Sequence, residues 1–249
     1  MIDLTRRGSV AVLRMVHGKA NALDVEFCDA LQAQLDECAQ SDAGALVLTG
    51  DGKMFSAGVD LLRIVNDGAG YVRSFLPSLN RMLETLFSCP KPVVAAVNGH
   101  AIAGGCVMAS AADYRMMARE PGRIGIPELL VGVPFPVVPL EIMRFAAPRQ
   151  YLQALAYRGL TLSADEALQH GLVDAVIGAE TLLDEAVAVA ASMAAIPAAA
   201  FSLTKLQMRA PTRRRMRAGA AVDTDVQDAW ASPETLSAIR GYVARTLKR

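Results

Sequence analysis

The fold is decided by residues 98–118, which read NGHAIAGGCVMASAADYRMMA. The short, β-branched apolar run from Pro92 to Val97 comes before them and is closed by Asn98-Gly99, which predicts a buried strand. After Gly104-Gly105, small and apolar side chains predict a short buried helix. A glycine pair that opens a helix leaves backbone N–H groups near the positive end of the helix dipole. The stretch therefore predicts either an anion-binding turn or a tight strand-to-helix packing turn.

A second turn of small residues follows another predicted strand. Residues 55–61 read FSAGVDL, and they come after the apolar strand pattern from Ala45 to Thr49 and a short loop. If the two strands are neighbours, each turn can direct one backbone N–H at a single carbonyl oxygen, which is how an oxyanion hole is built. The two turns together indicate a site where negative charge develops on a substrate oxygen.

These turns and further motifs in the same order resemble the enoyl-CoA hydratase/isomerase, or crotonase, superfamily. The motifs are KANAL at 19–23, FSAGVDL at 55–61, NGHAIAGGCV at 98–107, IGIPELLVG at 124–132, LSADEA at 162–167, GLVD at 171–174 and LTK at 203–205. The resemblance implies an α/β fold, the crotonase spiral of ββα units, over residues 1–179 with the active site. It implies a C-terminal helical region over residues 180–249 that covers the site and builds oligomers.

The resemblance also implies roles for particular residues. In this superfamily, two backbone N–H groups hold the thioester carbonyl of an acyl-CoA and stabilise the enolate formed from it. By position, these donors are Val59 and Gly104. The implied substrate and CoA contacts are Lys19, Ala20, Ala22, Leu23, Ala57, Gly58, Val59, Asp60, Leu61, Gly104 and Pro127. We expect no metal and no separate cofactor, because coenzyme A is part of the substrate.

The chemistry depends on two carboxylate positions of the family. Classical hydratases have one glutamate after the glycine stretch and another in a Pro-Glu motif, and together these hold and activate water. Here the first position is Val107 and the second is Glu128. Valine can neither orient water nor carry a proton, so half of the hydratase acid–base pair is missing. Glu128 alone can move a proton from C2 to C4 of a 3-enoyl-CoA, and we expect burial to raise its pKa.

Other motifs favour the isomerase branch of the family. FSAGVDL, AGGCV and residues 112–115, 193–197 and 223–227 resemble mitochondrial-type Δ3,Δ2-enoyl-CoA isomerases, whereas Pro127 is hydratase-like. The predicted function is therefore a Δ3,Δ2-enoyl-CoA isomerase of fatty-acid β-oxidation. The alternatives are an enoyl-CoA hydratase, a CoA-thioester hydrolase, or a non-catalytic member that binds acyl-CoA or RNA. Without the family context, Glu128 would be read as a capping or paired glutamate at a turn.

Composition limits the partners of the chain. Its 249 residues are 53% hydrophobic, enough to bury a large core, and 25 basic residues balance 25 acidic ones. No overall field therefore attracts nucleic acid or anionic lipid, although Arg213–Arg217 could be a solvated helix face or a contact for CoA phosphates. With no long apolar run and no signal-type N-terminus, we expect a cytoplasmic protein without a membrane span. The resemblance implies a homotrimer, or a hexamer formed as a dimer of trimers.

Local patterns give further expectations. Val25–Gln40 is predicted to be a helix with Asp24 as its N-cap, and Ser163 with Glu166 is predicted to form the capping box of a short helix that ends before Gly171. The polar, glycine-rich residues 66–70 predict a mobile stretch before the next helix. Pro197 and Pro211 are expected to break the C-terminal helices. His17 is expected at the surface, His100 and His170 in structural roles, and the four cysteines as buried, inert thiols.

Overall fold

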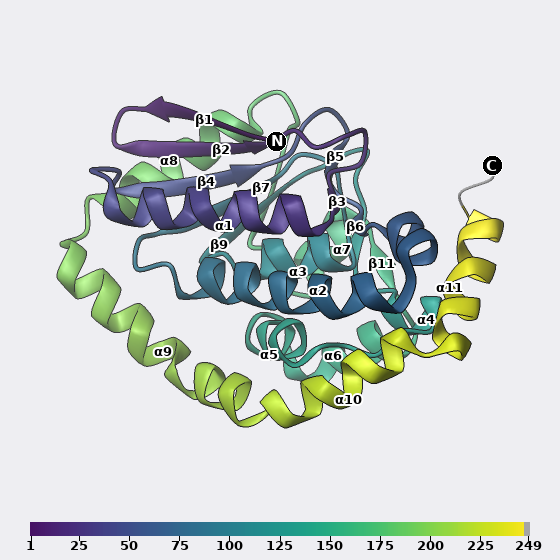
Figure 1. Cartoon of the computed structure of the whole chain (residues 1–249). Helices are drawn as coiled ribbons and strands as arrows, with labels where there is room; N and C mark the ends of the chain where they lie inside the picture. Colours follow the sequence, from purple (N-terminus) through teal and green to yellow (C-terminus); the bar gives the residue numbers. More distant parts are fainter. Residues whose placement is uncertain (247–249) are drawn as a thin grey trace.

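The computed structural model describes residues 1–246, which form an α/β core partly encircled by C-terminal helices (Figure 1). The main sheet has the strand order β1-β2-β4-β7-β9-β12, and all neighbours are parallel except β1 and β2. Its strands are β1 Ile2–Arg7, β2 Val10–Met15, β4 Ala45–Thr49, β7 Val93–Val97, β9 Tyr114–Ala118 and β12 Ala175–Ile177. Parallel neighbours of this kind are joined by crossover connections and not by tight hairpins.

Short strands form a second sheet where the main strands end. Its order is β11-β10-β8-β5, and the pair β3–β6 lies beside it. These strands are β3 Ala22–Leu23, β5 Met54–Ser56, β6 Gly58–Val59, β8 His100–Ile102, β10 Ile124–Gly125 and β11 Thr161–Leu162. Because β5 and β8 pair in parallel, the two small-residue turns that follow them lie next to each other.

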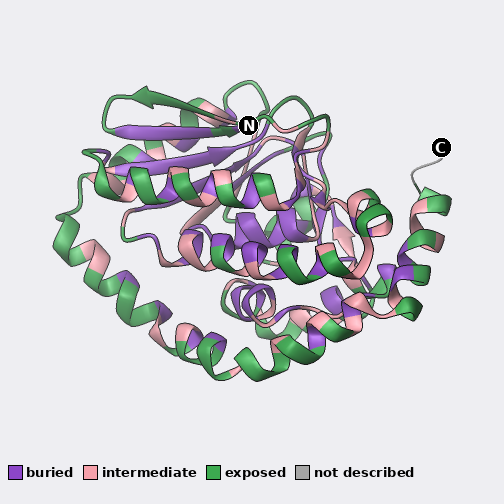
Figure 2. Ribbon diagram, viewed as in Figure 1, coloured by how far each residue is buried: buried purple, intermediate pink, exposed green. Residues whose placement is uncertain are grey.

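The helices of the core pack around a central buried element. They are α1 Val25–Gln40, α2 Leu61–Ser88, α3 Gly104–Ala111, α4 Glu128–Val131, α5 Val137–Ala146, α6 Arg149–Tyr157 and α7 Ala164–Gln169. All residues of α3 are buried, and Figure 2 shows it as a continuous buried segment between α2 and the sheet. Asp24 caps α1 as predicted, since its Oδ1 accepts the Phe27 N–H at 2.7 Å. The predicted capping box at Ser163 and Glu166 is also present.

The C-terminal helices are α8 Leu182–Ala194, α9 Ala198–Ala218, α10 Ala220–Ala231 and α11 Pro233–Thr246. α8 packs on the main sheet through small and apolar side chains, among them Leu182, Ala186 and Ala190. From α9 to α11 the chain follows an arc around the core, and α11 reaches α4 at the far side (Figure 1). The division of the chain at residue 180 stays a prediction.

The prediction that residues 66–70 precede the next helix is wrong, because they lie within α2. α2 begins at Leu61, where the Asp60 side chain caps it by accepting the Arg63 N–H at 3.0 Å. Within α2, Gly68 leaves helical geometry, with φ 69° and ψ −154°, so that two helical segments meet at a kink there. Burial of Ile64 and Val72 on either side holds both parts against the core. The glycine signal therefore marks a kink inside α2, and tertiary packing holds the segment before it in helical form.

The predicted break at Pro211 is also wrong, because Pro211 lies inside α9. The helix is anchored close to the proline by Arg209, which is 3% exposed. The Arg209 guanidinium donates to the carbonyl oxygens of Phe87, Ala111 and Ala112. These contacts hold α9 on the core, so the proline is accommodated. By contrast, Pro197 separates α8 from α9 as expected.

No single helix within residues 1–246 has the length and apolar character needed to cross a membrane. Only α8 and α9 taken together pass that test, and they are bent by 101° at their junction. All four cysteines are free and buried, and burial raises the pKa of each thiol above its usual value. This matches the expected inert thiols.

Candidate active site

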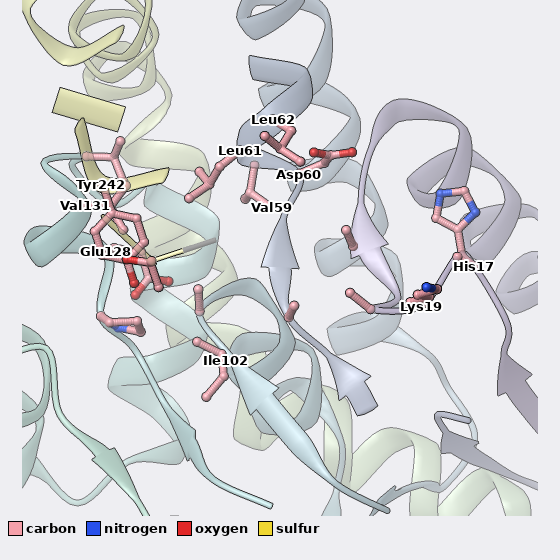
Figure 3. Close-up of a pocket in the computed structure, with 18 of the residues that line it drawn as sticks. His17, Lys19, Val59, Asp60, Leu61, Leu62, Ile102, Glu128, Val131 and Tyr242 are labelled. Carbon is pink, nitrogen blue, oxygen red and sulfur yellow. The ribbon is translucent and has the colours of Figure 1, made fainter. Parts of the chain in front are cut away.

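A cavity of about 500 Å³ lies where the two glycine turns face the C-terminal helices (Figure 3). Many of the residues expected from the sequence line it: Lys19, Ala20, Ala22, Ala57, Val59, Asp60, Leu61, Pro127 and Glu128. Leu23, Gly58 and Gly104 are not on its surface but form the layer directly behind it. A Cβ on Gly104 would come 2.6 Å from Leu23 Cδ1 and 3.8 Å from Gly58 Cα. The structure therefore brings the predicted residues together.

The two turns are in direct contact, and glycine makes this contact possible. Gly58 has φ +83°, and a Cβ there would come 2.7 Å from the Ile102 carbonyl oxygen and 3.1 Å from the Gly104 nitrogen. Any side chain would therefore push the turns apart. Gly104 is the first residue of α3, so its N–H belongs to the helix-terminal donors without an intrahelical acceptor. Ala103 before it has φ 53°, an uncommon value for a residue with a Cβ.

A buried hydrogen-bond network fixes the loop of residues 17–23 to the first turn. Asn21 is 2% exposed, and its side-chain N–H₂ donates to the carbonyls of Met15 at 3.0 Å and Phe55 at 3.2 Å. Ser56 Oγ donates to the Asn21 carbonyl at 2.7 Å and accepts the Gly58 N–H at 3.1 Å. Ser56 and the side chain of Asn21 therefore set the position of the turn, a role that the sequence analysis missed. The only signal in the sequence was that Asn21 and Ser56 are polar residues between small and apolar ones.

Glu128 is the first residue of α4 and lies on the cavity wall. Its Oε2 is buried and has no hydrogen-bond partner among residues 1–246. Burial, which penalises the charged form, raises the pKa of this carboxyl to about 8, and only a weaker backbone hydrogen bond acts against it. This agrees with the expected raised pKa. A carboxyl with such a pKa can both accept and donate a proton near neutral pH.

The other carboxylate on the cavity wall is differently placed. Asp60 caps α2, and Figure 3 shows its side chain pointing away from Glu128. Val107, the family position for a second glutamate, is 1% exposed within α3 and does not line the cavity. Asp113 is bound by Lys205 at 2.6 Å and Arg209 at 2.7 Å. Glu128 is therefore the carboxylate on the cavity wall that no structural contact occupies.

His17 and Lys19 lie across the cavity from Glu128 (Figure 3). His17, expected at the surface, is only partly exposed, and its Nε2 lies 2.7 Å from Asp24 Oδ2. The same aspartate caps α1, so the imidazole is tied to the start of that helix. His170 stacks on Tyr151 with ring centroids 3.9 Å apart, in line with its expected structural role.

The C-terminal helices supply cavity residues that the sequence analysis did not identify. They are Trp230 from α10 and Tyr242 and Thr246 from α11, together with Val131 and Val133 near Glu128. No local pattern says which helix will end over the cavity, although the single tryptophan was a weak signal. None of Arg213–Arg217 lines the cavity, and Arg215 instead pairs with Glu141 at 2.6 Å. Part of this basic run therefore fastens α9 to α5.

Known proteins match both the fold and the motifs. The family model for enoyl-CoA hydratase/isomerase matches residues 5–245. Human mitochondrial enoyl-CoA delta isomerase 1 is 30% identical over 231 residues, which cover 92% of this chain and 76% of that protein. A putative enoyl-CoA hydratase of Thermus thermophilus is 36% identical over 205 residues, 80% of each protein. The crystal structure of human mitochondrial Δ3-Δ2-enoyl-CoA isomerase gives a TM-score of 0.94 at 26% identity, covering 99% of this chain and 98% of that one.

Fold and cavity together define an acyl-CoA-processing enzyme with the crotonase fold, which confirms the fold class expected from the sequence. The chain belongs to the enoyl-CoA hydratase/isomerase family. It matches relatives named as isomerases and relatives named as hydratases. Family membership alone therefore does not define the reaction, which depends on the side chains at the cavity.

Proposed function

We propose that the protein is a Δ3,Δ2-enoyl-CoA isomerase in which Glu128 is the single acid–base residue. The observation that carries the proposal is the state of this carboxylate. Its Oε2 has no partner among the described residues, its pKa is raised to about 8, and the family position for a second glutamate is a buried valine. Proton transfer between C2 and C4 needs a single base. Water addition in this family uses two carboxylates.

The proposed reaction starts with a 3-enoyl-CoA whose thioester oxygen accepts hydrogen bonds from the N–H groups of Val59 and Gly104. Ionised Glu128 removes a proton from C2, and the electrons move onto the thioester oxygen to give a dienolate. The two N–H donors stabilise the charge that develops there. Glu128 then returns the proton to C4, which leaves a 2-enoyl-CoA conjugated with the thioester. The apolar wall around Glu128 leaves little room for water that could add to this product.

The test is turnover of 3-hexenoyl-CoA, followed by the ultraviolet absorbance of the conjugated product, with hydration of 2-hexenoyl-CoA measured in parallel. We expect isomerisation by the native protein, its loss in Glu128→Gln, and little hydration. Glu180→Gln, at an exposed residue outside the cavity, is the control and should behave as the native protein. Hydration without isomerisation would replace the proposal with the hydratase alternative. Tight acyl-CoA binding without turnover would favour a binding protein.

We also propose that the protein acts in fatty-acid β-oxidation, in the cytoplasm, as a homotrimer or a dimer of trimers. Support for an assembly comes from α9, where large apolar side chains are exposed on the single chain. Leu203 is 60% exposed, Leu206 49% and Met208 64%. Monomers seldom expose such residues together on one element, and Figure 2 shows α9 as mostly exposed.

A further inference from the structure

The cavity has two chemically different ends. His17, Lys19 and Asp60 are on one side, while Glu128, Val131 and Tyr242 are on the other (Figure 3). Val133 and Trp230 also line the cavity, and Trp230 belongs to the Glu128 end because it contacts Pro134, the neighbour of Val133. The end beyond Glu128 is therefore apolar and aromatic. This is the environment in which an acyl chain, and not the polar part of coenzyme A, gains free energy by burial.

Trp230 is a fixed part of the cavity wall. The residue is 2% exposed. Its indole Nε1–H donates to the Pro134 carbonyl at 2.8 Å, which fixes the orientation of the ring. A buried indole that moved aside would lose this hydrogen bond and leave a buried acceptor unpaired. The ring therefore does not act as a gate.

The helix that carries Trp230 is itself held in place. The Asp223 carboxylate of α10 accepts the Val137 N–H at 2.8 Å and the Asn80 side-chain N–H₂ at 3.1 Å. Asp228 of α10 pairs with Arg73 of α2 at 2.9 Å. These contacts join α10 to α5 and α2, so the wall is part of the packed structure.

We infer that Trp230 sets the upper limit of acyl-chain length, so that the substrates are short- and medium-chain enoyl-CoA thioesters. The inference rests on the proposed function in one respect, which is that the thioester lies at Val59 and Gly104. From there the chain extends past Glu128 along Val131 and Val133 and ends at the indole. A longer chain has to displace the ring or leave its last methylene groups in water, so the added length gains no binding free energy.

The test compares binding of two saturated thioesters, hexanoyl-CoA and dodecanoyl-CoA, by titration calorimetry. We expect the native protein to bind hexanoyl-CoA more tightly. In Trp230→Ala the ratio of the two dissociation constants should shift by roughly tenfold or more toward dodecanoyl-CoA, because the space of the indole becomes available. Trp230→Phe keeps most of the bulk and should keep the native ratio. Lys19→Ala, at the opposite end, should weaken both ligands by the same factor.

The native protein offers a second readout because it contains one tryptophan. Hexanoyl-CoA should change the emission of Trp230, whereas coenzyme A alone should leave it unchanged, since the free thiol does not reach the indole. This measurement decides the matter if Trp230→Ala does not fold. Equal binding of both thioesters by the native protein, an unchanged ratio in folded Trp230→Ala, or unchanged emission with hexanoyl-CoA would overturn the inference.

The two proposals fail in different ways, because the binding test uses thioesters that cannot react. Length-selective binding without isomerisation of 3-hexenoyl-CoA would remove the proposed function and leave the role of Trp230 intact. Isomerisation with no length selectivity would remove the role of Trp230 alone.

Discussion

Two carboxylates of this protein, at Asp113 and Glu128, have opposite surroundings. Asp113 accepts hydrogen bonds from Lys205, from Arg209 and from the Val93 N–H at 2.8 Å. Glu128 Oε2 has no partner among residues 1–246, and its pKa is raised to about 8. Glu128 Oε2 is itself buried, so its missing partner has an energetic cost. The comparison separates a carboxylate that holds α9 to the core from one that has no structural partner.

The contrast extends to the cations at Asp113. Lys205 and Arg209 are 7% and 3% exposed, and burial lowers the pKa of both while the charge of Asp113 opposes this. Arg209 also stacks on Phe87, with the guanidinium carbon 4.2 Å from the ring centroid. Both oxygens of the Asp113 carboxylate are therefore occupied, by two buried cations and one backbone N–H. Glu128 has none of these compensations, which is the arrangement expected where a proton is transferred.

The largest expected effect is on catalysis at Glu128. Glu128→Gln keeps the shape of the side chain but cannot accept a proton, so isomerisation should fall by roughly 10²- to 10⁴-fold. Steady-state rates with 3-hexenoyl-CoA measure this, and binding of hexanoyl-CoA should be nearly unchanged. A residual rate above a tenth of the native value would show that another group carries the proton.

The next largest effect is on stability at Asp113. Asp113→Asn leaves Lys205 and Arg209 as buried cations without a counter-charge, and we expect a loss of about 3–5 kcal/mol in the free energy of unfolding. Urea unfolding followed by circular dichroism measures it. Asp165→Asn, which removes an exposed partner of Arg119, is the matched control and should change stability by less than about 1 kcal/mol. Unaltered stability with a lost isomerisation rate would contradict the structural role of Asp113.

A third effect depends on pH. Because the base must be ionised, kcat/KM should rise about tenfold per pH unit below the pKa of about 8 and level off above it. The free energy of unfolding should instead fall as pH rises. The folded protein holds the Glu128 proton above the ordinary pKa of 4.5, so the contribution of this group to stability falls as pH rises from 4.5 to 8. Glu128→Gln should lack this fall and be more stable than the native protein at alkaline pH, by roughly 2–4 kcal/mol.

Rates and unfolding curves of both proteins across this pH range provide the check. A flat profile of kcat/KM, or equal pH dependence of stability in the two proteins, would mean that Glu128 is already ionised at neutral pH. Glu128 and Asp113 would then differ only in their contacts within the fold.

The smallest expected effect concerns Ser56 behind the first turn. Ser56→Ala removes a donor to the Asn21 carbonyl and an acceptor for the Gly58 N–H, and it should lower stability by about 1–2 kcal/mol. As the turn that carries Val59 becomes less well positioned, kcat should fall more than KM changes. The control is Ser74→Ala, whose exposed hydroxyl donates only to the Tyr71 carbonyl. Equal kinetics for both variants would leave Ser56 a purely structural residue.

Short-range rules account for the parts of the fold that the sequence predicted well. The Asp24 cap, the Ser163 capping box, the strand from Pro92 and the opening of α3 at Gly104 all depend on residues within a few positions of one another. The same rules placed the start of α2 too late and failed at Pro211. Burial of Ile64 holds the segment before Gly68 on the core, and the hydrogen bonds of Arg209 outweigh the local preference at Pro211.

The sequence by itself determined the order of strands and helices, the two glycine turns, and Glu128 as the carboxylate that remains where Val107 replaces a family glutamate. Glycine conformations, capping and missing functional groups can be read from the type of residue alone. Only the tertiary structure decided that Trp230 and Tyr242 line the cavity, that Asn21 and Ser56 support the first turn, and that Asp113 pairs with two buried cations. These features join segments that are far apart in the chain, and the packing of the whole fold determines which of them meet.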